Sequence, residues 1–561
     1  MNAGNRNPAR LLTGIRLVVV LLSTCLSAAV PARADAAVDP VVEALRERVD
    51  LEQETGQLRI GGREIVSSVG LPTLYGARGF QPLWRDPGKV RELLALVEES
   101  YEDGLLPVDY HLTALARLWP AVRPDASPDE IADLDILATD AYMLLLYHLY
   151  FGKVDPRSVE ATWNYSTREI TGEQAASFVG NAIASGRLRE AVEAARPSHW
   201  MYAHGRGALR EYRDIASRGG WPQVPGGETL KPGMNDPRIV DLRKRLAVTG
   251  DLVGQPLDLE FYDEPLVEAV RTFQRRHLLT PDAAIGKATL AELNVPVEDR
   301  IRQIRVNLER GRQILHEIGD EDLVIVDIAG FEVRYVQDRK VTWTSRVVVG
   351  QPYRQTPIFQ SQIEYIVINP TWTVPPGILQ KDILPAVRKD IGSLARRGLE
   401  VVDRSGRRLD PTAIDWTRYS GNSFPYFIRQ GAGPDNALGR VKIMFPNPHL
   451  VYLHDTPSRS LFERDDRAFS SGCIRVQKPF ELVERLLADP AWDPAALAAA
   501  VDSGETRTIR LSRPVRVLLI YWTVDEDDAG RVIFKRDVYN RDAALARALD
   551  RRFSFGSRPA I

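Results

Sequence analysis

The chain has 561 residues, enough for about three or four domains of ordinary size. Its 73 lysines and arginines almost balance its 75 aspartates and glutamates, so there is no basic excess to suggest nucleic-acid binding. A hydrophobic content of 44% is typical of a globular protein.

Residues 1–34 have the pattern of a secretory signal peptide. They contain four arginines and no acidic residue, an apolar run at 17–30 (LVVVLLSTCLSAAV), and the sequence Ala-Arg-Ala at the end, which has the form of a signal-peptidase site. The run is shorter than the ~20 apolar residues of a membrane-spanning helix. Thr24 before Cys25 is a poor match to a lipoprotein signal. The sequence therefore predicts export, with an uncleaved N-terminal anchor as the alternative. Cleavage would change the net charge from −2 to −6.

Residues 35–225 are predicted to be mainly helical. The stretches VRELLALVEES (90–100) and IADLDILATDAYMLLLYHLYF (131–151) have helical length and apolar spacing. The most apolar part, 141–151, is too short to span a membrane and is interpreted as a buried core helix. This region shows no catalytic constellation.

Residues 226–296 are predicted to form a compact three-helix unit. The apolar positions expected to face its core are Ile239, Leu242, Leu246, Leu266, Val270 and Phe273. The following residues, 297–320, are predicted to be a linking helix with an apolar stripe, and we expect it to pack between two domains.

From residue 321 to 540 the pattern changes to strands. Segments at 322–350, 362–370 and 449–454, and two more near the end of the region, are rich in β-branched and aromatic residues. An insertion at 375–424 interrupts the strands. Long excursions from a compact domain are often functional, so we predict that this one is a lid. The remaining residues, 541–561, are interpreted as a C-terminal tail.

Cys473 is the only cysteine of the sequence outside the predicted signal peptide. Exported proteins use cysteine mostly in disulfides, and a single cysteine cannot form one within its own chain. A lone exported cysteine indicates a reactive thiol or an intermolecular bridge, with an inert buried thiol as the alternative. The Ser-Ser-Gly turn before it and the arginine two residues after it are untypical of core packing and favour a reactive thiol.

His454 is the candidate base for this thiol. It ends the predicted strand HLVYLH and lies 19 residues before Cys473. A catalytic cysteine is usually activated by histidine, and a strand end followed by a polar loop and a small-residue turn would bring the two side chains together. A histidine that only makes strand-end hydrogen bonds is the alternative. Neither HExxH nor a cysteine pair is present, so we expect no metal and no cofactor.

The two motifs together resemble the signature of the L,D-transpeptidase catalytic domain. The family pattern is H-G/D-T, a polar loop and S-H/S/N-G-C-I/V-R, and this chain has HDT at 454–456 and SSGCIR at 470–475. NPTWTVPPGIL at 369–379 and GPDNALGRVKIMFPN at 433–447 are similar to the large Gram-negative subfamily. The resemblance implies an exported, periplasmic enzyme of cell-wall biogenesis and cell shape.

The resemblance covers nearly all of the chain after the signal peptide. Residues 226–296 resemble a peptidoglycan-binding domain, and 35–225 resemble the subfamily's helical scaffold. The implied fold class is therefore α+β multidomain, with a helical scaffold domain, a small three-helix peptidoglycan-binding-like domain and a mainly-β catalytic domain with a helical lid insertion. Ser471 departs from the family where many members have a second histidine. His277 and Ala283 depart from the binding-domain pattern, so the resemblance there implies the fold more than the ligand binding.

The resemblance also implies a reaction. These enzymes cleave the amide between the L-centre of a diamino acid and the terminal D-alanine of a tetrapeptide stem, forming a thioester that a neighbouring stem amine resolves into a 3→3 cross-link. Cys473 is then the nucleophile and His454 the general base and acid. The N–H groups of Gly472 and Cys473 are expected to form an oxyanion hole supported by Ser471, with Arg475 beside the thiolate or a stem carboxylate.

Several alternatives stay open at this point. Arg475 is almost equally well explained as part of a structural ion pair, and Asp455, Ser471 or a backbone carbonyl is expected to orient His454. Peptidoglycan stems are the implied donor and acceptor, with other cell-wall synthesis proteins as further partners. If water is the acceptor, the protein is an L,D-carboxypeptidase or hydrolase. If neither residue is catalytic, it is a wall-binding scaffold.

Overall fold

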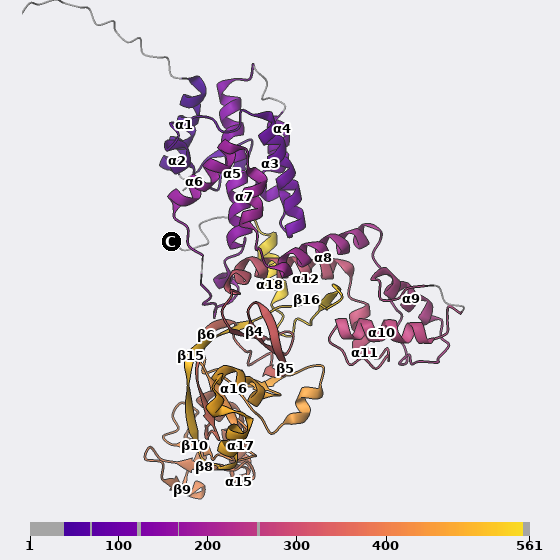
Figure 1. Ribbon diagram of the computed structural model, residues 1–561, viewed down its shortest axis with the longest axis vertical. Helices are drawn as coiled ribbons and strands as arrows, with labels where there is room; N and C mark the ends of the chain where they lie inside the picture. Colours follow the sequence, from indigo (N-terminus) through magenta and orange to yellow (C-terminus); the bar gives the residue numbers. More distant parts are fainter. Residues whose placement is uncertain are drawn as a thin grey trace, which may run out of the picture.

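The computed structural model describes residues 39–553, except 56, 68–69, 120–124, 167 and 255–257. The predicted signal peptide, with Cys25, lies outside the described residues. Figure 1 shows an elongated molecule, with a helical domain at one end, a strand-rich body in the middle and a smaller strand-containing lobe at the other end. Within the described ranges, no helix combines the length and apolar character needed to cross a bilayer.

The helical domain is built around one long buried helix, α5. Ser127 and Glu130 form a capping box at its start, and it ends at Gly152. Its apolar residues are buried on nearly all sides, which confirms the predicted core helix. The helices that surround it are α1 (Pro40–Thr55), α2 (Gly70–Gly76), α3 (Pro87–Glu99), α4 (Leu112–Leu118), α6 (Gly172–Ser185) and α7 (Leu188–Ala195), with α5 itself at Pro128–Phe151.

Two further helices, α8 (Trp200–Ser217) and α12 (Val297–Ile314), lie side by side across the middle of the molecule (Figure 1). The guanidinium of Arg312 is buried in α12 and donates to Glu309 at 2.6 Å and to the Asp103 carbonyl of the helical domain at 2.8 Å. Helix α12 thus packs against the helical domain. The segment interpreted as a tail begins with helix α18 (Asp542–Asp550), which packs on α12.

The three-helix unit consists of α9 (Arg238–Val248), α10 (Glu264–Arg276) and α11 (Lys287–Leu293). Its predicted apolar positions all lie in one buried cluster. The unit contacts the strand-rich body through α10, where Arg276 donates to the Val532 carbonyl at 2.7 Å. His277 stacks on Phe273 within the unit, with ring centroids 3.8 Å apart. The residue that departs from the family pattern is therefore part of the packed core.

The strand-rich body is a nine-stranded sheet in the order β13-β5-β14-β12-β11-β6-β15-β3-β4. Strand β4 also pairs with β5, so the sheet closes on itself. The strands are β3 (Leu323–Asp327), β4 (Glu332–Gln337), β5 (Lys340–Gly350), β6 (Phe359–Ile368), β11 (Val441–Met444), β12 (Leu453–His454), β13 (Ala468–Ser470), β14 (Ile474–Val476) and β15 (Arg507–Ile520). Helices α16 (Pro479–Leu487) and α17 (Pro494–Asp502) and the hairpin of β16 (Val524–Glu526) and β17 (Val532–Phe534) complete the body.

The predicted strand at 449–454 is much shorter than expected. Only Leu453–His454 are extended in the sheet, as β12. Leu450 has a φ of 56°, in the left-handed region, and this interrupts the extended backbone. The Asn447 side chain accepts from the backbone N–H groups of His449 and Val451, so the segment forms a side-chain-stabilised loop instead.

The insertion is a separate lobe with its own sheet and core. Its four strands, in the order β7-β10-β8-β9, include two that lie outside the expected 375–424 boundaries. Leu384, Val401 and Ile428 are buried in a core that is separate from that of the main sheet. The elements are β7 (Trp372–Thr373), α13 (Pro376–Ile378), a π-helical turn (Leu379–Ile383), α14 (Leu384–Lys389), α15 (Gly392–Arg396), β8 (Leu399–Val402), β9 (Arg408–Leu409) and β10 (Phe427–Gln430).

Candidate active site

Strand pairing brings the two predicted catalytic residues to one face of the sheet. Strands β12 and β14 run parallel, with Leu453 opposite Ile474 and His454 opposite Arg475. Leu453 and Ile474 are fully buried in the core. Since side chains alternate along a strand, His454, Cys473 and Arg475 share the other face. The residue before Leu453, Tyr452, lies on that face too.

The turn that carries Cys473 is held by its own serine. Ser470 Oγ accepts a hydrogen bond from the Gly472 N–H at 3.0 Å and donates to the Cys473 carbonyl at 2.5 Å. Gly472 has a φ of 117°, which an L side chain rarely adopts. Glycine is thus required at this point for the chain to present the thiol.

A second layer supports the turn from the loop after β5. The buried Thr356 hydroxyl accepts from the Gly350 N–H and donates to the Gly472 carbonyl, both at 2.9 Å. Tyr539 donates to the Gly350 carbonyl at 2.7 Å and accepts from the Thr356 N–H at 3.2 Å. Sequence reasoning missed these residues. The available signal was the turn sequence GQPYRQTP, which follows a predicted strand directly.

A backbone carbonyl orients His454. Its Nδ1 lies 2.5 Å from the Asp455 carbonyl oxygen, which places the proton on Nδ1 and the basic lone pair on Nε2. The Asp455 carboxylate is engaged elsewhere, since it accepts from the Arg440 N–H at 2.9 Å and forms an ion pair with Arg459. Of the three groups expected to orient the imidazole, the carbonyl is the one that the structure places there.

The resting pair is electrically neutral. Burial, together with the nearby cations Arg475 and Lys442, lowers the pKa of His454 to about 3. Burial also raises the pKa of Cys473, although hydrogen bonds from Tyr452 and the charges of Lys442 and Arg475 act in the opposite direction. Cys473 Sγ lies 3.6 Å from the Leu450 carbonyl, as a thiol donor would.

Two cations, Lys442 and Arg475, act on His454, and only Arg475 was predicted from the sequence as a site residue. Lys442, which pairs with His454 across β11 and β12, places its Nζ 3.9 Å from the centre of the Tyr452 ring. Arg475 has no carboxylate within ion-pair distance in the described part of the chain, and its buried Nε has no hydrogen-bond partner there. The structural ion pair considered for Arg475 is therefore absent among these residues, and the guanidinium is available to an anion.

One of the two N–H groups expected to form the oxyanion hole, that of Gly472, has another partner. The Gly472 N–H is already donated to Ser470, so it does not point freely at a substrate oxygen. The Cys473 N–H has no hydrogen-bond partner within the described ranges. The turn thus offers one free donor where two were predicted, because the Ser470 hydroxyl closes the turn through the other.

Ser471 connects the turn to the insertion. Its hydroxyl accepts from Arg354 at 2.8 Å, and the same guanidinium pairs with Asp382 of the insertion at 2.6 Å and 3.0 Å. Ser471 thus lies next to Cys473 in the chain but contacts Arg354, which also pairs with the insertion, rather than His454. Among the described residues, no cluster of three or more metal-ligating side chains occurs here or elsewhere.

Three family models match successive parts of the chain. Residues 70–209 match a scaffold domain, 235–293 match a model described as "Putative peptidoglycan binding domain", and 321–517 match the L,D-transpeptidase catalytic domain. A Haemophilus influenzae protein described as "Putative L,D-transpeptidase" is 35% identical over 224 residues, which are 40% of this chain and 45% of that protein. The alignment thus spans less than half of that relative.

Solved structures of low identity also align with the chain. The L,D-transpeptidase crystal structure from Xylanimonas cellulosilytica is 14% identical and has a TM-score of 0.17, covering 53% of this chain and 99% of its own. The one from Stackebrandtia nassauensis is 14% identical with a TM-score of 0.19, covering 53% and 96%.

Proposed function

Because this chain belongs to the L,D-transpeptidase family and also contains scaffold and peptidoglycan-binding domains, we propose that it cross-links peptidoglycan stems through a thioester on Cys473. The observation that carries the proposal is the shared sheet face, on which a buried, neutral His454 lies opposite Arg475, two residues from the only cysteine after the predicted signal peptide. A neutral imidazole can accept a proton, which a general base must do.

In the first half-reaction Cys473 attacks the carbonyl of the diamino acid's L-centre in a tetrapeptide stem. The thiol proton passes to Nε2 of His454 as the carbon–sulfur bond forms. The Cys473 N–H stabilises the oxyanion. When the amide carbon–nitrogen bond breaks, His454 returns the proton to the amine of the departing D-alanine.

In the second half-reaction the side-chain amine of a neighbouring stem attacks the thioester. A new amide bond forms, the carbon–sulfur bond breaks, and the proton lost by the amine returns to the cysteine through His454. The product is a 3→3 cross-link. The free guanidinium of Arg475 binds a carboxylate of the stem and favours the developing thiolate.

The insertion covers the cleft during this second step. The Arg354–Asp382 ion pair and the Arg354–Ser471 hydrogen bond, which connect it to the catalytic turn, support this role. Exclusion of water matters because hydrolysis would consume the thioester. The reaction takes place in the periplasm, where the predicted signal peptide would deliver the protein, and the scaffold domain contacts other cell-wall synthesis proteins.

Mass spectrometry of purified tetrapeptide-containing wall fragments, after incubation with the protein, tests the proposal. Cross-linked dimers with release of D-alanine are expected. Tripeptides alone would identify an L,D-carboxypeptidase instead. Unchanged fragments would favour a wall-binding scaffold.

A further inference from the structure

Lys442 is a cation on the catalytic face of the sheet that the reaction above does not use. It lies in β11 between Val441 and Ile443, which are fully buried in the core. Because side chains alternate along a strand, Lys442 points to the opposite face. It pairs with His454 across β11 and β12, and directly paired residues of an antiparallel sheet share a face. Lys442 therefore lies on the face that carries His454 and Cys473.

Lys442 has no carboxylate within ion-pair distance in the part of the chain that the structure describes. Its Nζ lies instead 3.9 Å from the centre of the Tyr452 ring. Asp455, the acid that follows the histidine in the chain, is paired with Arg459. Burial lowers the pKa of Lys442, and the charge that opposes this shift is that of Cys473 rather than that of an acid.

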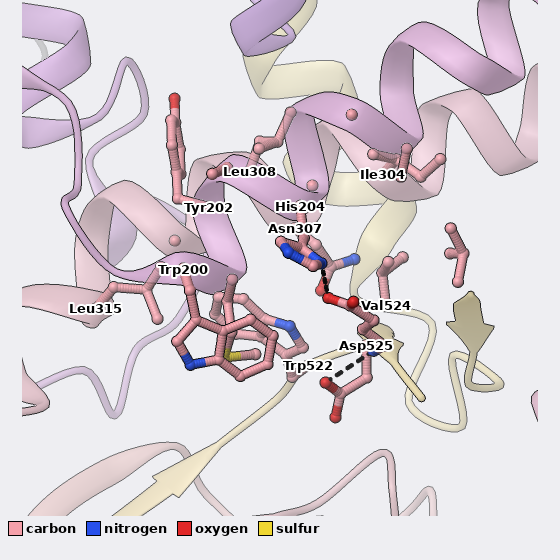
Figure 2. Close-up of a pocket in the computed structure, with 18 of the residues that line it drawn as sticks. Trp200, Tyr202, His204, Ile304, Asn307, Leu308, Leu315, Trp522, Val524 and Asp525 are labelled. Carbon is pink, nitrogen blue, oxygen red and sulfur yellow. Dashed lines mark hydrogen bonds and ion pairs between the residues drawn. The ribbon is translucent and has the colours of Figure 1, made fainter. Parts of the chain in front are cut away.

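The buried Lys535 shows the more usual arrangement. It pairs with Asp327 at 2.5 Å and with Asp525 at 2.8 Å. Figure 2 shows Asp525 at a cavity between α8, α12 and the β16–β17 hairpin, so the charge of this residue is balanced within the chain. Buried charges without partners are costly. Lys442 and Arg475 place two cations without a carboxylate on one face, and this face is therefore complementary to an anionic ligand.

The order of the strands assigns different parts of a substrate to the two cations. Strands β14, β12 and β11 are neighbours in that order, so His454 lies between Arg475 on one side and Lys442 on the other. Cys473 directly precedes β14 and belongs to the Arg475 side. Attack by the thiol holds the acyl part of a stem on that side. Since the leaving amine takes its proton from His454, the rest of the leaving group extends toward Lys442.

Tyr452 connects Lys442 to the reacting sulfur. Its hydroxyl donates to the Cys473 thiol, while the lysine Nζ lies over its ring. One tyrosine side chain thus spans the distance from the thiol to the ammonium. In an α-amino acid a single carbon separates the amine from the carboxylate. A carboxylate at Lys442 is therefore compatible with an amine beside His454.

We propose that Lys442 binds the α-carboxylate of the terminal D-alanine, which is the leaving group of the first half-reaction. The ammonium donates to this carboxylate, while Arg475 binds a carboxylate of the acyl part. The assignment rests on the proposed function, because the donor stem is taken from it. Lys442 is then the residue that selects stems with a free C-terminal carboxylate over stems that are amidated or extended by a further residue.

Calorimetric titration of the full chain carrying Cys473→Ala tests the proposal without turnover. The two probes are a synthetic tetrapeptide stem with a free C-terminal carboxylate and the same stem with a C-terminal amide. We expect the amide to bind at least tenfold more weakly, because it lacks the charge that pairs with Lys442. Addition of Lys442→Met, which keeps an unbranched side chain without the charge, is expected to bring the two affinities within twofold of each other.

Two further variants locate the effect. Lys442→Arg keeps a cation and is expected to retain at least a threefold preference for the carboxylate. Arg475→Met is the matched control, because it removes the other cation of the same face. It is expected to weaken the binding of both probes alike and to keep the tenfold preference. Binding of the amide probe by the Lys442→Met protein shows that this variant is folded.

Equal binding of the two probes by the Cys473→Ala parent would overturn the proposal. A preference that survives Lys442→Met would overturn it as well, since the lysine would then act on the thiol or on His454 instead. Loss of the preference in Arg475→Met alone would assign the carboxylate to the arginine. A preference that depends on Lys442, without release of D-alanine by the chain with Cys473 intact, contradicts the proposed function alone. Release of D-alanine without such a preference contradicts this inference alone.

Discussion

The catalytic turn and the insertion lobe are neighbours that are held in place in different ways. Hydrogen bonds from Ser470 and Thr356 fix the turn to the main sheet, whose strands are buried on the core side. The lobe has its own sheet and its own core, and Arg354, which pairs with Asp382 and donates to Ser471, connects it to the turn. The difference teaches that the proposed chemistry takes place on a turn held by the main sheet, whereas the proposed cover is a lobe with a core of its own. Each prediction below perturbs one side of this comparison.

The largest effect is expected at the base. His454→Gln keeps a similar size but cannot accept the thiol proton, so the rate of thioester formation should fall by roughly 10²–10⁴-fold. The rate of D-alanine release from a tetrapeptide stem measures this effect. A variant that released D-alanine at the parent rate would remove His454 from the mechanism.

The second-largest effect is expected at the hydrogen bonds that support the turn. Thr356→Val deletes the buried hydroxyl and leaves the Gly350 N–H and the Gly472 carbonyl without their partner, at a cost of about 1–3 kcal/mol per group. The misplaced turn should lower kcat by about 10–100-fold. Thr356→Ser, which keeps the hydroxyl, is the matched control and should stay near the parent. Equal kcat values for the two variants would show that the hydrogen bonds do not position the turn.

Lowering the pH should reduce the free energy of unfolding of the protein through His454. Its pKa in the folded protein is about 3, below the ordinary value of about 6.5, so between these values the unfolded chain binds a proton that the folded chain does not. Stability from this group therefore falls as the pH falls through that window, by up to ~1.4 kcal/mol per pH unit. His454→Gln should remove this part of the dependence. Denaturant unfolding of the two proteins between pH 6.5 and 4 measures it, and parallel curves would contradict the neutral buried imidazole.

The smallest effect is expected at the lobe. Asp382→Asn weakens the pair with Arg354, and partly exposed pairs contribute ~0–1 kcal/mol. The ratio of hydrolysis to cross-linking should rise about two- to fivefold, because water enters more often, while thioester formation stays near the parent rate. Asp390→Asn, which breaks the Asp390–Arg396 pair within the lobe, is the control. A ratio that Asp382→Asn leaves unchanged would contradict the role of this link.

The main domain classes and the two central residues, Cys473 and His454, could be predicted from local sequence. Cys473 and His454 were identifiable because their neighbours, the small-residue turn and the strand end, lie beside them in the chain. The predicted core helix at 131–151 and the linking helix at 297–320 followed from apolar periodicity, which local sequence also contains. These features depend on short spacings; the structure has a helix in each of the two ranges, whereas the strand that ends at His454 is shorter than predicted.

Features made by distant contacts were not predictable. Thr356 supports a glycine that lies 116 residues later, and nothing in its own segment indicates that. The pKa of His454 depends on burial and on two cations from different strands, so the neutral resting pair emerged only from the fold. The outer strands β7 and β10 were missed because each is short and pairs across the insertion rather than with its neighbour in sequence.

Intact-mass measurement of the acyl-enzyme tests the central claim most directly. The full chain is incubated with a tetrapeptide stem without an acceptor amine. The account predicts one adduct per chain, located on Cys473, formed slowly in His454→Gln and absent in Cys473→Ala. An adduct that persists in Cys473→Ala would place the nucleophile elsewhere and contradict the account.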